Sequence, residues 1–362
     1  MMLVISWLLA TVSFRCRAAN EYGLMGSMGS LSRRNIVVAA SILPLAGTRS
    51  FAAPADRVRF GMLYPNLVSV IHAIAKKIGA YEKYNVQVIE IHFKSGQATA
   101  GVEQLWRGNL DFYMGGAPEI PRLNSRVIES GGVSPLAVVS GTNPGHTSLV
   151  LANKLRPKTI DDLLDQRLRI AVSSLSSVHR AFLRGYLLTE KKVDLDKVPW
   201  RFVSVDAGNM ISALITDQID GFLHSEPTTT LAIVNSAGHL FMQAARGDMG
   251  PNPPPNSFLT TRRNFLAQSP ELVRRFLLAL FEANSAYEAA KDQMIPIMSD
   301  WSGVEERIIR AAIERMNPSA RMTVAQANRW WDFIGKAMAQ RGEIVPRMDP
   351  FKDVFELGYQ PL

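Results

Sequence analysis

Turns rich in small or polar residues follow three of the expected β-strands, at points where helices begin. They occupy residues 94–97, 114–118 and 173–179. Each would place free backbone N–H groups and hydroxyls at a helix N-terminus, which suits an anionic or carbonyl group. Glycines in the first two turns would let the backbone approach a ligand closely. A single turn of this kind is most often just a helix cap, so the prediction of a binding edge depends on all three together.

Two further segments carry side chains able to contact a solute. His179 lies where the first turn of a helix is expected and could donate to an anion, although a structural histidine is equally consistent with the pattern. Tyr64, Pro65 and Asn66 follow the first expected strand and could supply an aromatic wall and an amide, or form a simple turn.

Sequence motifs of the common enzyme classes are absent after residue 55. There is no dinucleotide-binding or phosphate-binding glycine motif, no zinc-protease motif and no nucleophile elbow. The histidines, at 72, 92, 146, 179, 224 and 239, are dispersed without metal-ligand spacing. We therefore predict no metal and no cofactor. A catalytic triad built from distant residues stays open at this point.

The charge pattern argues against nucleic-acid binding. The formal net charge is +8, and residues 1–55 carry half of it through five Arg and one Glu. The remaining +4 would favour anionic solutes by steering, or simply reflect a mixed solvated surface. No stripe of Lys or Arg with interleaved aromatic residues occurs.

The first 55 residues have the pattern of an export leader. Twin arginines at 33 and 34 precede an apolar run from 36 to 46, and small residues follow at 50–55. The run is about half the ~20 residues that span a bilayer, which favours a signal peptide over an anchor or a short buried helix. We predict a twin-arginine signal peptide within 1–55, cleavage after Ala52 or Ala55, and a periplasmic protein.

Two features of this leader bear on the start of the chain and on redox chemistry. A second apolar stretch, residues 1–12, precedes the arginine pair, so translation from Met25 or Met28 is an alternative to Met1. The single cysteine, Cys16, also lies here. The predicted mature chain therefore has no disulfide and no thiol nucleophile.

From residue 57 onward, short β-type runs alternate with amphipathic helical stretches, which predicts an α/β protein with mostly parallel sheets. Residues 250–256, rich in Pro and Gly, are predicted to connect two lobes rather than form a helix or central strand. Helices are expected over 270–291, 304–316 and 323–340. The expected strands are 58–62, 86–93, 110–114, 136–139, 149–152, 168–172, 200–205, 219–223, 240–243 and 257–261.

This order of elements predicts two lobes joined by two crossings. Residues 57–141 and 249–362 would form lobe 1, and residues 142–248 lobe 2. Two crossings make a hinge, and ligands bind in the cleft of such clamps.

Six segments in this order resemble the nitrate/sulfonate/taurine-type substrate-binding proteins of ABC importers, which are related to pyrimidine-precursor-binding proteins. They extend over about residues 57–290 of the chain. The segments are IGAYEKYNVQVIEIHFKSG, LWRGNLDFYMGGAP, TIDDLLDQRLRIAV, SSLSSVH, ALITDQIDGFLHSEP and SPELVRRFLLAL.

The resemblance implies a periplasmic-binding-protein type II fold that closes over a small solute and delivers it to an inner-membrane ABC permease. It implies a monomer without catalytic residues. The implied ligand-binding positions are Tyr64, Pro65, Asn66, Ser95, Gly96, Gln97, Gly116, Ala117, Ser176, Ser177, His179, Asp206, Ala207, Gly208 and Glu226.

Two departures from the family pattern concern the ligand. Leu175 replaces the glycine usual before the Ser-Ser-x-His element, and His224-Ser225 stands where a tryptophan often precedes Glu226-Pro227. Sulfonate, nitrate, taurine, a pyrimidine or an aromatic carboxylate would each fit a polar cleft of this kind. Because a glutamate near the cleft would repel a bare anion, a zwitterion or an amine-bearing solute stays open.

Two other function classes remain open on this fold. Desulfinases and pyrimidine synthases resemble the family, but the desulfinase cysteine falls where this chain has Tyr64-Pro65-Asn66. A histidine-based enzyme would have to use His72 or His92. A sensory binding module would leave the binding-site prediction unchanged.

Overall fold

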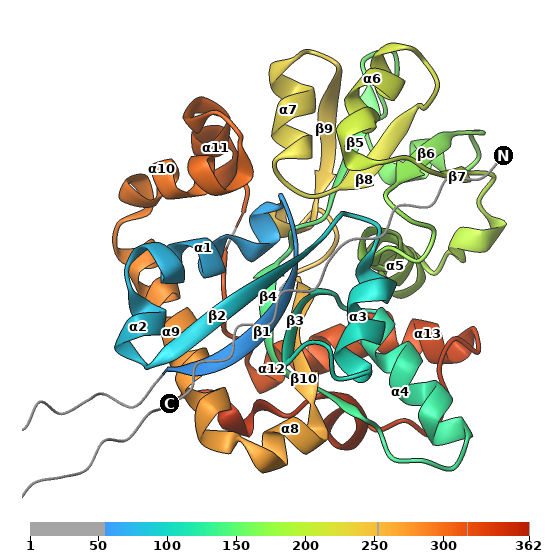
Figure 1. The fold of residues 1–362 in the computed structure, drawn as a ribbon. Helices are drawn as coiled ribbons and strands as arrows, with labels where there is room; N and C mark the ends of the chain where they lie inside the picture. The colour runs from blue at the N-terminus through green and yellow to red at the C-terminus, as the bar shows by residue number, and fades with distance from the viewer. Residues whose placement is uncertain (1–54, 252, 317, 362) are drawn as a thin grey trace, which may run out of the picture. The chain divides into compact units, whose positions relative to one another are not determined.

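The computed structural model describes residues 55–251, 253–316 and 318–361. The predicted leader therefore lies outside the described residues, apart from Ala55. Two five-stranded sheets form the framework, as the α/β prediction requires (Figure 1). No described helix combines the length and apolar character that crossing a membrane needs.

The first sheet has the strand order β2-β1-β3-β10-β4. Strands β1, β2 and β3 are parallel, and β10 pairs antiparallel with both β3 and β4. Four strands thus share one direction. Their bounds are β1 Asp56–Leu63, β2 Val86–Phe93, β3 Phe112–Gly116, β4 Leu136–Pro144 and β10 Pro255–Arg262.

The second sheet has the order β7-β6-β8-β5-β9, in which β5 alone runs against the other strands. Each sheet is thus mostly parallel, as predicted, with one reversed strand. The bounds are β5 Ser148–Ala152, β6 Arg169–Val172, β7 Arg201–Ser204, β8 Gly221–His224 and β9 Gly238–Gln243.

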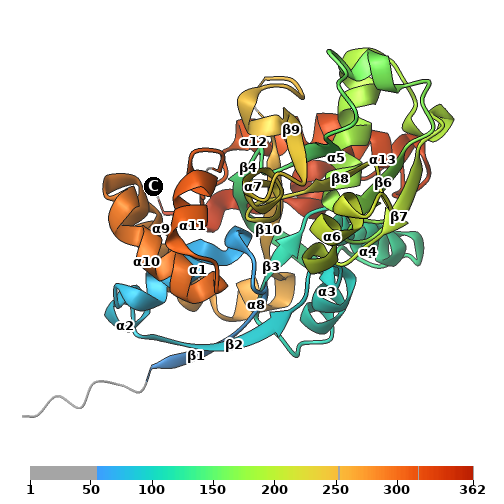
Figure 2. The same cartoon turned by 90° about the horizontal axis from the view of Figure 1, so that it is seen from above.

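Helices cover both faces of the first sheet. Figure 2 shows α1, α9 and α10 on one side and α3 and α4 on the other. The helices are α1 Val70–Lys77, α2 Ala80–Lys83, α3 Ala98–Trp106, α4 Glu119–Glu129, α5 Val178–Tyr186, α6 Met210–Ile215, α7 Thr228–Val234, α8 Arg263–Gln268, α9 Pro270–Ala289, α10 Lys291–Ser302, α11 Glu306–Ile313, α12 Val324–Trp330 and α13 Lys336–Gln340.

Strand β3 shows why both faces are covered. Phe112 and Met114 join the apolar cluster beneath α1 and α9, while Tyr113 between them joins the opposite cluster. Successive side chains of a strand point to opposite faces, so a fully apolar strand needs helices on both sides. Burial on both faces explains why the sequence of β3 is continuously apolar.

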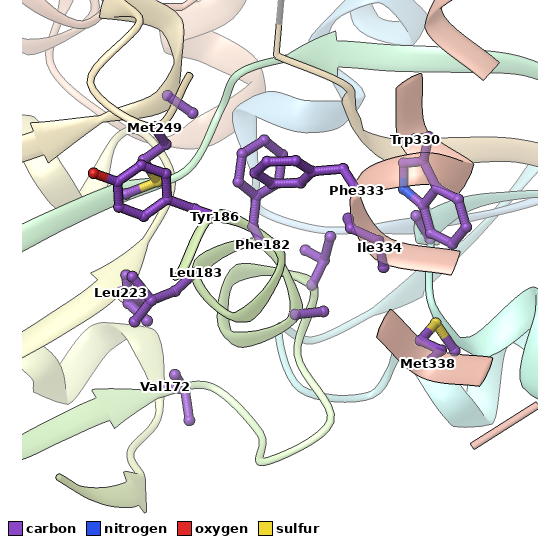
Figure 3. Close-up of a cluster of buried hydrophobic side chains, with 14 of the residues drawn as sticks. Val172, Phe182, Leu183, Tyr186, Leu223, Met249, Trp330, Phe333, Ile334 and Met338 are labelled. Atoms are coloured by element: carbon purple, nitrogen blue, oxygen red, sulfur yellow. The ribbon is translucent and has the colours of Figure 1, made fainter. Parts of the chain in front are cut away.

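The C-terminal helices join α5, beside the second sheet, to β10 of the first. The Phe182 and Phe333 rings have centroids 5.1 Å apart, and Figure 3 shows them facing each other among buried side chains. The ring centroids of Trp330 and of Phe258 on β10 lie 5.0 Å apart. One apolar cluster therefore includes residues that pack beside both sheets.

The structure corrects three details of the prediction. Pro255 and Asn256 belong to β10, a central strand, because a proline at the first position of a strand loses no ladder donor that the sheet requires. Helix α10 contains Pro296 and was not predicted; burial of Ile295 and Met298 offsets the lost helical bond. Helix α8 was also missed.

The chain passes between the sheets twice, at 144–148 and 243–255. The first sheet extends to Pro144, three residues beyond the predicted lobe boundary. The division into two lobes at these boundaries stays a prediction.

Candidate functional site

The candidate site lies where loops from the two sheets meet. In the first sheet, the loops after β1, β2 and β3 leave the same edge because the three strands are parallel. The loop after β6 faces them from the second sheet. A Cβ added to Gly96 would lie 2.9 Å from the Ser173 carbonyl oxygen, so the two loops touch.

A cavity of about 50 Å³ lies among these loops. Its walls come from both sheets and include the start of α5. Of the predicted site residues, it is lined by Asn66, Ser95, Gly96, Gly116, Ser177 and His179.

A second cavity of about 410 Å³ shares Asn66, Ser95 and His224 with the first. Its walls also include apolar side chains from α6, α7 and the segment after α10. Of the predicted site residues, it is lined by Tyr64, Pro65, Asn66, Ser95, Asp206, Ala207 and Gly208.

Four predicted site residues line neither of these two cavities. The Gln97 side chain accepts the backbone N–H of Lys94, and Ala117 is fully buried. The Ser176 hydroxyl lies 3.0 Å from that of Ser174. Glu226 is buried and accepts the N–H of Thr230 at 2.9 Å.

Sequence reasoning missed several residues that line the smaller cavity, among them Glu119, Ser174, His224 and Asn256. Glu119 begins α4 directly after the glycine turn, and His224 ends β8. Both therefore lie near the ends of strands, where binding residues were expected from the sequence. Asn256 was not predicted as a site residue because it lies in a proline-rich segment that was expected to connect the two lobes.

Tyr64 is held at the wall of the larger cavity by an aromatic group. Its ring stacks on His92 with centroids 4.2 Å apart and meets Trp301 edge-on at 4.9 Å. Such pairs fix ring orientation and contribute about 0.5–1.5 kcal/mol each. Tyr64 is therefore a preorganised wall.

A hydrogen-bonded chain orients His179. Asn256 Nδ2 donates to Thr147 Oγ1 at 2.6 Å, and Thr147 Oγ1 lies 2.9 Å from His179 Nδ1. Donation by the Thr147 hydroxyl to Nδ1 would place the ring proton on Nε2. Burial holds the pKa of His179 well below its usual value. His179 is thus a neutral ring with one N–H donor.

Burial also shifts the pKa values of two other ionisable groups of the smaller cavity. Burial lowers the pKa of His224 to about 4 and raises that of the Glu119 carboxyl. No Lys or Arg occurs among the described residues that line this cavity. Hydrogen-bonding groups rather than permanent charges therefore dominate it.

The histidines suggested for an enzyme lie elsewhere. His72 is buried with Nδ1 2.7 Å from the Tyr81 hydroxyl, and His92 stacks on Tyr64. Neither lines either cavity. Within the described part of the chain, no group of three or more His, Asp or Glu is arranged to hold a metal ion.

The fold is that of the periplasmic binding proteins, as similarity to solved structures shows. The periplasmic aliphatic sulphonate-binding protein SsuA from Escherichia coli has TM-score 0.66 at 15% identity, covering 83% of this chain and 92% of its own. A ligand-binding component of an ABC-type import system from Staphylococcus aureus, solved with zinc bound, has TM-score 0.66 at 15% identity, with coverages of 84% and 97%.

The periplasmic nitrate-binding protein NrtA from Synechocystis PCC 6803 has TM-score 0.63 at 15% identity, covering 84% of this chain and 87% of its own. The chain belongs to the NMT1-like family, whose model matches residues 52–299. No curated protein matches the sequence. The resemblance to sulfonate- and nitrate-type binding proteins predicted from the sequence is confirmed.

Proposed function

We propose that this protein is the periplasmic substrate-binding component of an ABC importer. It captures a small polar or anionic solute between its two sheets and delivers it to a permease without chemical change. It acts as a monomer and reaches the periplasm through its twin-arginine leader. The support outside the chain is that similar structures are import-system binding proteins, two of them periplasmic.

The observation that carries this proposal is the composition of the cavity walls. Asn66 and Ser95 follow strands of the first sheet, while Ser177 and His224 come from the second. A ligand there would bridge both sheets, and the two crossings at 144–148 and 243–255 supply a hinge. Closure around a ligand is the expected result.

A thermal-shift panel tests the proposal. The purified protein is heated with sulfonates, taurine, nitrate, aromatic acids, carboxamides and pyrimidines. A ligand at ~100 times its dissociation constant adds about 2.7 kcal/mol to the free energy of unfolding. A shift by a compound recovered unchanged supports a binding protein. Conversion of the compound to product would instead favour an enzyme on this fold.

A further inference from the structure

The two cavities differ in a way that describes the solute. The smaller one, about 50 Å³, has room for a functional group of a few heavy atoms. The larger, about 410 Å³, is of the size that small-molecule ligands occupy. Its apolar walls are Tyr64, Pro65, Ile211, Pro227, Leu231 and Val304. The cavities share Asn66, Ser95 and His224, so they lie side by side.

One side of the smaller cavity donates hydrogen bonds. His179 pairs through Nδ1 with the Thr147 hydroxyl, and donation by that hydroxyl would leave the ring proton on Nε2. The nine-residue helix α5 begins here, with Ser177 as its N-cap, and its first N–H groups favour a partial negative charge. This side suits a carbonyl oxygen of the ligand.

The other side accepts hydrogen bonds. Asn256 is 1% exposed, and its Nδ2 is committed to Thr147, so Oδ1 has no partner among the described residues. Glu119 is 6% exposed, and its Oε2 likewise has none. Buried acceptors without a donor destabilise a structure. An N–H group on the ligand would satisfy them, whereas an anion would be repelled.

Among the described residues, no Lys or Arg lines the smaller cavity, and Lys94 lines the larger one. The nearest cation on α4, Arg122, is 2.6 Å from Glu343 and is occupied by that carboxylate. Burial raises the pKa of the Glu119 carboxyl. Moving an anion from water into the smaller cavity would cost free energy with no ion pair to offset it.

We propose that the solute is an uncharged primary carboxamide on an apolar or aromatic body. Its carbonyl oxygen would face His179 and the start of α5, its NH₂ group Asn256 and Glu119, and its body Tyr64 and Leu231. This inference rests on the proposed function, because it names the solute class of that same cleft.

Titration calorimetry at pH 7 tests it with three matched probes: 4-butylbenzamide, 4-butylbenzoate and 4-butylbenzenesulfonate. The amide should bind at least about tenfold more tightly than either acid, because only the amide satisfies both sides of the cavity. Nitrate and taurine, which have no apolar body, should bind more weakly still. An acid that binds as tightly as the amide, or tight binding of nitrate or taurine, overturns the inference.

A variant gives a second readout. Glu119→Gln offers an NH₂ donor in place of an acceptor and should reduce the preference for the amide over the benzoate at least fivefold. Glu129→Gln, at the exposed end of the same helix, should keep the wild-type preference. An unchanged preference in the folded Glu119 variant contradicts the assignment. If that variant does not fold, the matched probes still decide on the unmodified protein.

The two proposals fail differently. Binding of an acid without chemical change overturns the carboxamide inference and leaves the binding-protein function standing. Conversion of any probe to product, or no shift across the whole solute panel, overturns the function itself.

Discussion

The carboxylate of Glu343 lies 2.6 Å from Nη2 of Arg122 on α4 and also accepts a hydrogen bond from Nη1 of Arg184 on α5, at 3.4 Å. Arg122 additionally donates to the carbonyl oxygen of Ser176 at 3.5 Å. One carboxylate thus ties a helix beside the first sheet to the helix that presents His179, behind the loop at 173–177.

Replacing Glu343 by Gln should lower the free energy of unfolding by about 1–3 kcal/mol. This loss is expected because the Arg184 side chain is only 9% exposed and would lose one charged partner. Urea unfolding at pH 7 measures the loss. The matched control is Glu305→Gln, which removes an exposed pair with Arg307 and should leave the free energy of unfolding nearly unchanged. Equal losses in both variants would contradict the bridging role.

Gly96 offers a test of the contact between the loops. Its φ is +94°, and an added Cβ would lie 2.9 Å from the Ser173 carbonyl oxygen. Gly247 has a similar φ of +83° but no atom within 4 Å of an added Cβ. Both Ala variants should lose about 1–2 kcal/mol of stability through the left-handed backbone. Only Gly96→Ala should weaken binding of the solute found in the thermal-shift panel, by tenfold or more. Equal affinities in the two variants would show that the contact plays no part in binding.

The sequence predicted the strands well, because each is a short apolar or alternating run between turn residues. All ten predicted strands overlap an observed one, and Val86–Phe93 agrees at both ends. The helices were harder. Proline at 296 argues against a helix, and only tertiary burial of Ile295 and Met298 makes α10 favourable. A local pattern carries no information about such burial.

The site was predictable where it follows local turns, as at Asn66, Ser95 and Ser177. Asn256 was not, because it reaches the cavity on β10, a strand that returns to the first sheet from beyond the second. Glu226 stays a prediction. It is buried, accepts the N–H of Thr230 and lines neither cavity.

The packing of α5 on the C-terminal helices should tolerate no extra atom at Gly185. A Cβ there would lie 2.4 Å from the Phe333 carbonyl oxygen and 2.8 Å from its ring. Gly185→Ala should therefore destabilise the protein by about 1–3 kcal/mol through overpacking. Gly358→Ala is the control, since its nearest contact is a Glu356 oxygen at 3.7 Å. Thermal unfolding of both variants gives the comparison, and a stable Gly185 variant would mean that α5 is not tightly packed.

Glu226 should make the protein less stable as pH rises toward neutrality. Burial raises its pKa to about 7, against the hydrogen bond from Thr230 and the charge of Arg315. In the unfolded chain the carboxyl ionises near pH 4.5, so between about pH 4.5 and 7 the folded state binds more protons than the unfolded state. The free energy of unfolding then falls with rising pH, by up to about 3 kcal/mol. Above pH 7 this contribution is constant.

Glu226→Gln removes the titration, so the stability difference, variant minus wild type, should increase from pH 4.5 to 7 and level off beyond. Buried histidines such as His146, whose pKa burial lowers to about 3, change stability in the opposite direction below pH 6.5. Their effects are common to both proteins and cancel in the difference. Urea unfolding at half-unit pH steps measures it, with Glu271→Gln, whose side chain is 70% exposed, as the control. A Glu226 difference as independent of pH as the control's would show that this carboxyl ionises normally in the folded protein.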